Sequence, residues 1–173
     1  LRWYEKRMLD LPIVILILPI ASCIVLLAAV ALKISDPLAP IIFVQWRAGL
    51  AGKPFRIFKL RTMLGSDIGH CRTPDSERQF PVGRFLRRTS IDELPQLINV
   101  LMGQMSLVGP RPQMLSYIPR MGRRFFRRHA ALPGITGLAQ ISGRNRQTWT
   151  ERFETDLTYV KHQSLMSDFK ILV

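Results

Sequence analysis

The longest apolar stretch of this chain runs from Leu11 to Leu32, 22 residues without a charged side chain. A helix rises about 1.5 Å per residue, so this stretch is long enough to cross the hydrocarbon of a bilayer. It is longer than the apolar part of a typical secretory signal, and no clear small-x-small cleavage site precedes a polar start. The pattern therefore predicts a membrane helix near the N-terminus.

Two features leave the topology of this helix open. Pro19 lies inside the stretch, where it removes a backbone hydrogen bond and favours a kink. Basic residues flank both ends: Arg2, Lys6 and Arg7 before it, and Lys33, Arg47, Lys53, Arg56 and Lys59 after it. The positive-inside rule then places both flanks on the cytoplasmic side. A hairpin that enters and leaves by the same leaflet fits these features, and a single pass is the alternative.

Shorter patterns follow the membrane helix, which ends at Asp36-Pro37. Residues 41–45 and 55–60 are β-favouring runs on either side of two glycines, and they predict a small hairpin. Residues 83–88 predict a short basic helix. Ser90 and Glu93 form a capping-box pattern, which predicts the start of a helix that continues to about Leu101.

The second half of the chain favours helices and turns. Residues 114–129 mix aromatic residues with arginines around Pro119, which is typical of an interfacial segment. Residues 132–137 predict a turn-rich connector, and residues 149–162 predict a last helix. Residues 65–79 are polar and irregular, and we expect a loop there.

The net charge of the chain narrows the kinds of molecule that it could bind. The chain has 173 residues, about one domain, and a formal charge of +13 from 25 Lys+Arg against 12 Asp+Glu. This balance indicates nucleic acid, anionic lipid or phosphate-bearing substrates. A membrane-tethered nucleic-acid-binding module is one alternative, but the aromatic residues lie beside apolar segments and no nucleic-acid motif is present. Cys23 and Cys71 give no disulfide framework or zinc spacing, which fits a reducing compartment.

Asp92 and Glu93 are adjacent carboxylates at the predicted helix start. The plain interpretation makes Glu93 the capping partner of Ser90, and Asp92 a complement to the helix dipole. In the functional interpretation, the free N–H groups of a first helical turn attract phosphate. They also keep a carboxylate ionised, as a nucleophile or a metal ligand requires.

Arg111 lies in the sequence Pro110-Arg111-Pro112, where two prolines fix the backbone on both sides. This presents the arginine to an anion at reduced entropic cost, although a rigid turn with a solvent-facing arginine is the alternative. Lys59 and Arg61 share one face of a predicted strand, and Arg144 lies in a Gly-Arg-Asn turn. Three histidines form no metal-binding spacing, and we expect them at the surface: His70, His129 and His162.

Taken in order, these motifs resemble those of the monotopic phosphoglycosyl transferases, bacterial sugar transferases that initiate glycan assembly on polyprenol phosphate. The resemblance covers nearly the whole chain. Its motifs are Lys6-Arg7-Met8-Leu9-Asp10, Lys59-Leu60-Arg61-Thr62-Met63, Ser90-Ile91-Asp92-Glu93-Leu94-Pro95-Gln96, Met105-Ser106-Leu107-Val108-Gly109-Pro110-Arg111-Pro112, Pro133-Gly134-Ile135-Thr136-Gly137, Gly143-Arg144-Asn145 and Ser167-Asp168-Phe169-Lys170-Ile171.

The resemblance implies a mostly helical α+β fold with a small β-hairpin and interfacial amphipathic helices. Residues 1–35 would form a re-entrant membrane helix, and residues 36–173 a catalytic domain on the cytosolic face. Asp92 would attack the sugar-bearing phosphate of a UDP-sugar, release UMP and form an aspartyl-phosphosugar, which polyprenol phosphate then accepts. Mg²⁺ would lie near Asp92, and Glu93 would support proton transfer or metal binding.

The site implied by this resemblance has Asp92 and Glu93 as catalytic residues, with Asp92 also as the metal ligand. The phosphate-binding set comprises Lys59, Arg88, Arg111 and Arg144. Three positions depart from the family pattern: Leu18 replaces the serine before Pro19, Gln104 an acidic residue, and Leu132 an arginine. None of them is Asp92 or Glu93, so we expect activity.

We therefore expect a transferase of glycan or exopolysaccharide biosynthesis on the cytoplasmic face of a bacterial inner membrane. Its partners would be a UDP-sugar, polyprenol phosphate and membrane lipids, without nucleic acid. An inactive scaffold that recruits other glycan enzymes is a second alternative. The sequence begins at Leu1 without an initiator methionine, which leaves an upstream segment open.

Overall fold

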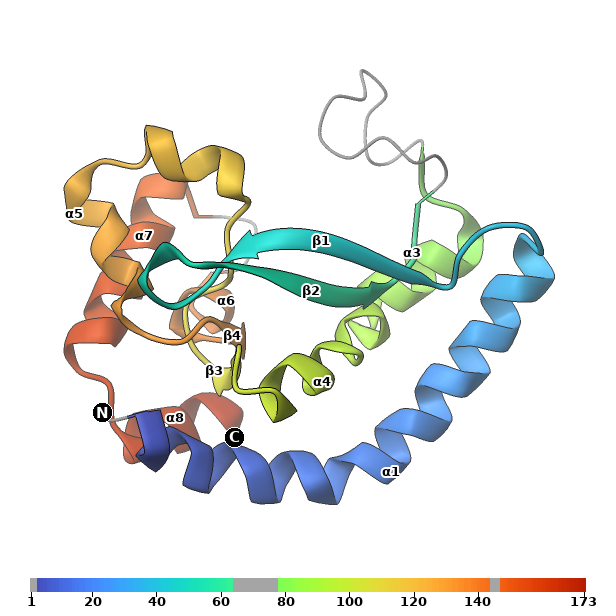
Figure 1. Ribbon diagram of the computed structural model, residues 1–173, viewed down its shortest axis with the longest axis horizontal. Helices are drawn as coiled ribbons and strands as arrows, with labels where there is room; N and C mark the ends of the chain where they lie inside the picture. Colours follow the sequence, from blue (N-terminus) through green and yellow to red (C-terminus); the bar gives the residue numbers. More distant parts are fainter. Residues whose placement is uncertain (1–2, 64–77, 144–146) are drawn as a thin grey trace. The chain divides into compact units, whose positions relative to one another are not determined.

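A computed structural model describes residues 3–63, 78–143 and 147–173 (Figure 1). Most of the predicted loop at residues 65–79 lies outside these ranges, as do His70, Cys71 and Arg144. Within them the chain is mostly helical, with a two-stranded hairpin and a second pair of very short strands. The predicted mixture of many helices and a small hairpin is confirmed.

Helix α1, Trp3–Ser35, contains the whole apolar stretch. It ends immediately before Asp36-Pro37, as predicted, because a residue that precedes proline is disfavoured in helical geometry. Within the described residues α1 is the one helix long and apolar enough to cross a membrane, and only 17% of its most apolar part is buried. Pro19 lies inside α1, and the helix continues on both sides of it.

The chain forms two compact units, and α1 is divided between them at Leu16 and Ile17. The first unit comprises Leu1–Leu16, Gln45–Ile57 and Gln96–Val173. The second unit comprises Ile17–Val44 and Phe58–Pro95. The division falls close to Pro19, so the two halves of the helix pack with different parts of the chain.

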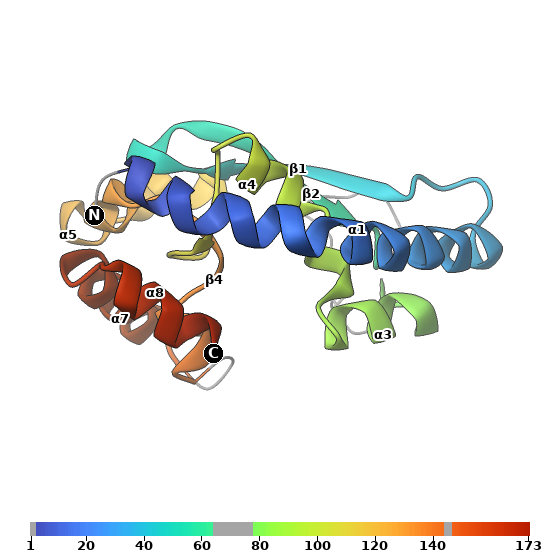
Figure 2. The same ribbon diagram turned by 90° about the horizontal axis from the view of Figure 1, so that it is seen from below.

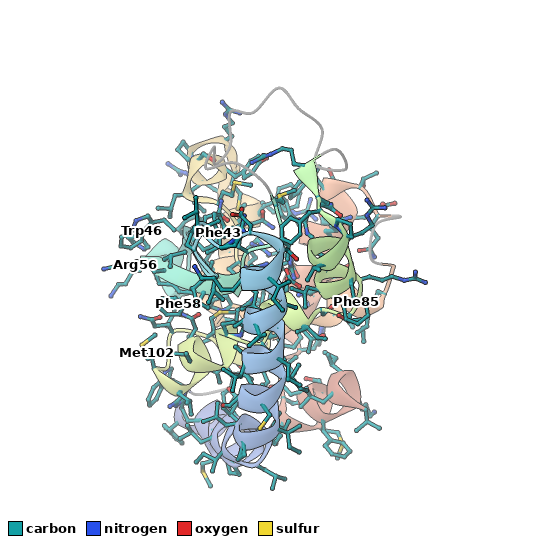
Figure 3. The ribbon with its side chains drawn as sticks, turned by 90° about the vertical axis from the view of Figure 1, so that its right-hand side faces the viewer. Phe43, Trp46, Arg56, Phe58, Phe85 and Met102 are labelled. Carbon is teal, nitrogen blue, oxygen red and sulfur yellow. The ribbon has the colours of Figure 1, made fainter. Side chains whose placement is uncertain are left out.

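The predicted hairpin is present as strands β1, Ile42–Ala48, and β2, Pro54–Leu60 (Figure 1). Its connection contains a 3-10 turn, η1 (Leu50–Gly52), in which Gly52 has a positive φ of 73°. A side chain at Gly52 would also approach the Phe126 ring within 3.0 Å, so glycine is needed for both reasons. Trp46 and Arg56 lie beside each other on the exposed face, with the guanidinium 5.3 Å from the ring centroid (Figure 3).

A small apolar core holds the second unit together. Ala28 and Leu32 of α1 pack with Leu60 of β2 and with Leu86 of helix α3, Pro81–Arg88. Helix α3 confirms the predicted basic helix, and its first residue is a proline, whose fixed φ suits that position. Gly83 packs so closely that an added Cβ would lie 2.3 Å from the carbonyl oxygen of Thr62. The second half of α1 therefore supports β2 and α3.

The predicted capping box at Ser90 is wrong. Ser90 has a left-handed backbone with φ 58°, and its side chain makes no capping hydrogen bond. A 3-10 turn, η2 (Ile91–Glu93), follows, and helix α4 begins only at Gln96 and ends at Leu101. Pro95 has no N–H to donate to the carbonyl of Ile91, so one continuous α-helix from Ser90 is not favoured.

The first unit contains a parallel strand pair that the sequence did not reveal. Strand β3, Ser106–Val108, pairs with β4, Gly134–Thr136, so part of the predicted connector is a strand. Each strand has three residues and is bordered by glycine or proline, which hides it from any periodic pattern. Gly134 is required because an added Cβ would lie 2.1 Å from the backbone nitrogen of Gly109.

Short helices complete the first unit. The aromatic and arginine-rich segment forms η3 (Leu115–Arg120), α5 (Arg123–Phe126) and η4 (Arg127–Ala130). Helix α6 is Leu138–Ile141, and α7, Trp149–Lys161, confirms the helix predicted at residues 149–162. It is not the last helix, because α8 follows at Leu165–Leu172. Eight residues are too few for a clear helical period, so α8 was missed.

Candidate active site

Lys59 and Glu93 form an ion pair in the second unit. The Lys59 ammonium lies 2.8 Å from a Glu93 carboxylate oxygen, and the two side chains are 17% and 14% exposed. The alternation of β2 places Lys59 opposite Leu60, whose side chain enters the core. Glu93 therefore binds a neighbouring cation rather than capping a helix at Ser90.

Asp92 lies beside this ion pair in sequence, within η2, and is 6% exposed. It does not occupy the first turn of an α-helix, so the expected stabilisation by a helix dipole is wrong. Asp92 is instead a buried residue of a 3-10 turn. Ser90, two residues before it, holds a backbone conformation that costs a residue with a side chain about 1–2 kcal/mol. Strain of this kind is often found next to functional groups.

Arg88 is the last residue of α3 and is exposed, as are Arg84 and Arg87. Arg61 has a different role from these cations. It binds Asp36 at 3.0 Å and the carbonyl oxygen of Pro40 at 3.0 Å, and is largely buried. Arg61 therefore ties the end of β2 to the segment after α1, whereas Arg88 remains at the surface.

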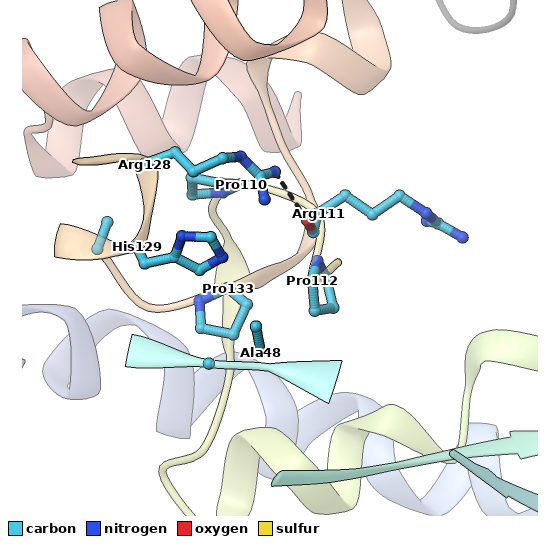
Figure 4. Close-up of a pocket in the computed structure, with 9 residues that line it drawn as sticks. Ala48, Pro110, Arg111, Pro112, Arg128, His129 and Pro133 are labelled. Atoms are coloured by element: carbon cyan, nitrogen blue, oxygen red, sulfur yellow. Dashed lines mark hydrogen bonds between the residues drawn. The ribbon is translucent and has the colours of Figure 1, made fainter. Parts of the chain in front are cut away.

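Arg111 lies in the first unit on a backbone that is anchored from both sides (Figure 4). The Gly109 N–H donates to Thr136, and Pro110 accepts from the Gly134 N–H at 3.0 Å. Arg128 donates to the carbonyl oxygen of Arg111 itself at 2.8 Å. Both flanking prolines are buried, while the Arg111 side chain is exposed and points away from the other residues of the recess. The segment therefore presents its arginine from a fixed backbone.

His129 is buried, so the prediction that it lies at the surface is wrong. Its Nδ1 lies 3.1 Å from the carbonyl oxygen of Phe126, and the ring lines the same recess as Pro110 and Pro133 (Figure 4). Burial, together with the neighbouring Arg128 charge, lowers the pKa of His129. The burial of His129 comes from tertiary packing, which an isolated histidine in an arginine-rich segment does not signal.

Arg128 and Asp156 form a buried ion pair that the sequence did not indicate. Two guanidinium nitrogens donate to one Asp156 oxygen at 2.6 and 2.9 Å, and the residues are 1% and 3% exposed. Burial raises the pKa of Asp156, while Arg128 acts in the opposite direction. The pair fixes the arginine that holds the Arg111 carbonyl, so it positions the Pro-Arg-Pro segment.

A second buried cluster joins the start of α1 to the rest of the first unit. Lys6 donates to Asp168 at 2.8 Å, to the Tyr159 hydroxyl at 2.8 Å and to the carbonyl oxygen of Val108 at 2.6 Å. Asp10 accepts from the N–H of Leu107 at 3.2 Å. Burial and the adjacent Asp168 raise the pKa of Tyr159. The sequence signal for this cluster was a pair of charged residues, Lys6 and Asp10, which lie four positions apart beside the apolar stretch.

The described residues contain no group of three or more His, Cys, Asp or Glu side chains placed to hold a metal ion. Mg²⁺ is commonly held by one or two carboxylates together with substrate phosphates, so such a group is not required. Asp92 and Glu93, adjacent in sequence, supply carboxylate oxygens of the type that a magnesium ion bound in that way takes.

The structure brings four of the predicted site residues into one unit: Lys59, Arg88, Asp92 and Glu93. Arg111 belongs to the first unit, and Arg144 lies outside the described residues. The second unit thus combines a buried carboxylate, an ion-paired carboxylate and surface arginines on a support that includes the second half of α1.

Comparison with known proteins defines the class. A family model described as bacterial sugar transferase matches residues 1–173. The uncharacterized sugar transferase EpsL of Bacillus subtilis is 48% identical over 170 residues, which cover 96% of this chain and 83% of that protein. The UDP-glucose:undecaprenyl-phosphate glucose-1-phosphate transferase of Caulobacter vibrioides is 43% identical over 181 residues, covering 98% and 67%.

A protein of the same name from Escherichia coli is 41% identical over 178 residues, which cover 96% of this chain and 38% of that protein. This chain belongs to the bacterial sugar transferase family. It is therefore a transferase, and the resemblance inferred from its motifs is confirmed.

Proposed function

We propose that this protein transfers a phosphosugar from a UDP-sugar to polyprenol phosphate through a covalent intermediate on Asp92. The supporting observation is the buried Asp92 carboxylate beside the Glu93–Lys59 ion pair, on a unit whose core includes the second half of α1. The relatives from Caulobacter vibrioides and Escherichia coli, whose names state this type of transfer, support the choice of donor and acceptor.

In the first step a carboxylate oxygen of Asp92 attacks the phosphorus atom that carries the sugar. An oxygen–phosphorus bond forms to Asp92, and the bond between that phosphorus and the UMP oxygen breaks, so UMP leaves with the bonding electron pair. In the second step an oxygen of polyprenol phosphate attacks the same phosphorus and frees the carboxylate. Two steps allow the soluble donor and the lipid acceptor to bind in turn.

Glu93 and Lys59 support this chemistry from the adjacent position. The 2.8 Å ion pair holds the Glu93 carboxylate in one orientation, where it would accept a proton from the acceptor phosphate or help to hold the metal ion. Arg88 at the end of α3 and Arg111 on its anchored segment bind substrate phosphates, as does Arg144. Guanidinium groups suit this role because they form paired hydrogen bonds with phosphate oxygens.

We also propose that Asp92, with support from Glu93, holds Mg²⁺ together with the substrate pyrophosphate. When bound, the ion reduces repulsion between an incoming pyrophosphate and the attacking carboxylate. EDTA should stop UMP release, and added Mg²⁺ should restore it. Full activity in excess chelator would contradict this part of the proposal.

Contacts at both ends of α1 support a re-entrant helix rather than a single pass. Lys6 near its start binds Asp168 in the first unit, and Leu32 near its end packs with Leu60 and Leu86 in the second unit, so each end contacts residues that follow the helix in the sequence. A straight pass would separate the ends by the thickness of the bilayer. The basic flanks at both ends support the proposal that this part of the chain lies on the cytoplasmic face of the inner membrane.

Cysteine labelling of intact cells tests this topology. New cysteines near Leu1 and Val173 should both be unreactive to an impermeant thiol reagent until the inner membrane is opened. A periplasmic N-terminus would establish a single pass.

Mass spectrometry of the intact protein tests the mechanism. Incubation with UDP-sugars, UDP-glucose among them, should produce protein heavier by one phosphosugar, together with UMP. Asp92→Asn should form no adduct while staying folded, whereas Glu154→Gln, a change at an exposed carboxylate paired with Arg124, should behave like the wild type. An adduct on another residue would refute Asp92 as nucleophile, and absence of UMP release with every donor would favour an inactive scaffold.

A further inference from the structure

Lys6 is buried although it lies at the start of the membrane helix. Its side chain is 2% exposed, and lysine is rarely buried in proteins unless it is paired. The ammonium group donates to Asp168 of α8, which lies alongside the start of α1 (Figures 1 and 2). The sequence suggested that Lys6 was a basic flank of the apolar stretch, but its charge is paired inside the first unit.

The contacts of Lys6 indicate a role beyond stability. Removing two charges from water often costs as much free energy as their attraction supplies, so a buried ion pair adds little net stability. The same ammonium group also donates to the carbonyl oxygen of Val108 at 2.6 Å. The Tyr159 hydroxyl, held by Asp168 at 2.6 Å, lies 3.2 Å from that oxygen. These buried side chains therefore converge on one backbone carbonyl.

The carbonyl of Val108 belongs to the backbone that presents Arg111. Because a peptide unit is planar, this carbonyl and the N–H of Gly109 move together. Lys6 holds the carbonyl, and the N–H donates to a carbonyl oxygen of β4 at 2.9 Å, so both polar groups of the unit are held. The next residue, Pro110, has a φ that its ring fixes, which leaves little rotational freedom between this peptide unit and the arginine.

From these contacts we infer that Lys6 is a positioning residue for Arg111. It holds the Val108 peptide unit and, through it, the direction in which the arginine leaves the backbone toward a substrate phosphate. Asp10, one turn further along the same face of α1, supports the same strand, because its carboxylate accepts from the N–H of Leu107 at 3.2 Å. This inference rests on the proposed function, in which Arg111 binds phosphate.

Amide hydrogen exchange of the full chain, in liposomes of phosphatidylethanolamine and phosphatidylglycerol, tests whether Lys6 holds this backbone. The test variant combines Lys6→Met with Asp168→Asn, so that no buried carboxylate is left without its cation. The matched control is Asp168→Asn alone, which loses the ion pair but keeps the amine that donates to Val108. Residues 105–112 should exchange several-fold faster in the test variant than in the control, whereas β2 should exchange equally in both.

Initial rates of UMP release test the link to Arg111. Relative to the control, adding Lys6→Met should slow the reaction about tenfold, and no more than Arg111→Ala does. In a chain that already carries Arg111→Ala, the same change should have little further effect, because the arginine that Lys6 positions has been removed. A purely structural role would instead reduce the folded fraction, and so the rate, by the same factor in both chains.

Equal exchange of residues 105–112 in the test variant and the control would overturn the inference. Faster exchange of β2 as well would indicate a general loss of stability and would also overturn it. Equal slowing with and without Arg111 would overturn it in favour of a structural role for Lys6. The exchange measurement requires no catalysis, so a failure of this inference can be told apart from a failure of the proposed reaction.

Discussion

Replacing Lys59 with methionine should show whether this residue positions Glu93 or contacts a substrate phosphate directly. Methionine retains the apolar stem of lysine but cannot pair with the Glu93 carboxylate, which lies 2.8 Å from the ammonium. Breaking a fully buried ion pair costs about 3–5 kcal/mol, and an exposed pair contributes about 0–1 kcal/mol. With side chains 17% and 14% exposed, this pair lies between these limits, at about 2 kcal/mol.

If Lys59 acts by holding Glu93 in position, loss of the ion pair should raise the activation free energy by about this amount. Lys59→Met should slow UMP release about 30-fold, the factor that corresponds to about 2 kcal/mol in activation free energy. The double variant with Glu93→Gln should then be no slower than Glu93→Gln alone, because the carboxylate that Lys59 holds has already been removed.

A double-mutant cycle measures this coupling from initial rates of UMP release at saturating UDP-sugar and Mg²⁺. Arg84→Met, which removes an exposed cation from α3, is the control and should change the rate little. If the double variant were slower than Glu93→Gln by the full factor of Lys59→Met, the two effects would be additive. That result would refute the positioning role and indicate that Lys59 contacts a substrate phosphate directly.

Three further predictions follow from the structure. Arg111→Ala should slow turnover about ten- to hundredfold while thermal stability changes little, because the side chain is exposed at the surface and its proposed role is to bind a substrate phosphate; wild-type kinetics would remove Arg111 from the site. Gly83→Ala should destabilise the second unit, since the added methyl meets the Thr62 carbonyl at 2.3 Å, and an unchanged melting temperature would contradict the close packing. His129 has a lowered pKa in the folded state, so the unfolded chain binds the extra proton more readily. Stability should therefore fall as pH drops below about 6.5, and His129→Gln should reduce this dependence in thermal melts across that range.

The sequence by itself determined the elements that depend on composition and local periodicity. A largely apolar stretch of 22 residues without a charge is long enough to predict a membrane helix, and β-favouring runs around two glycines predict a hairpin. The ordered motifs along the chain, among them the one that contains Asp92 and Glu93, were likewise sufficient together to indicate the family. Each of these signals is local, because it can be recognised from residues that lie close together in the sequence.

Tertiary structure decided the features in which distant residues meet. The sequence left Glu93 as either the capping partner of Ser90 or a functional carboxylate, and only the position of Lys59 on β2 made it an ion-paired carboxylate. Three-residue strands such as β3 and β4 are stabilised by each other, so neither has a pattern of its own. Lys6 and Asp168 are separated by 162 positions, yet their contact orients α8. No local propensity encodes such a pairing, because its energy exists only after the chain has folded.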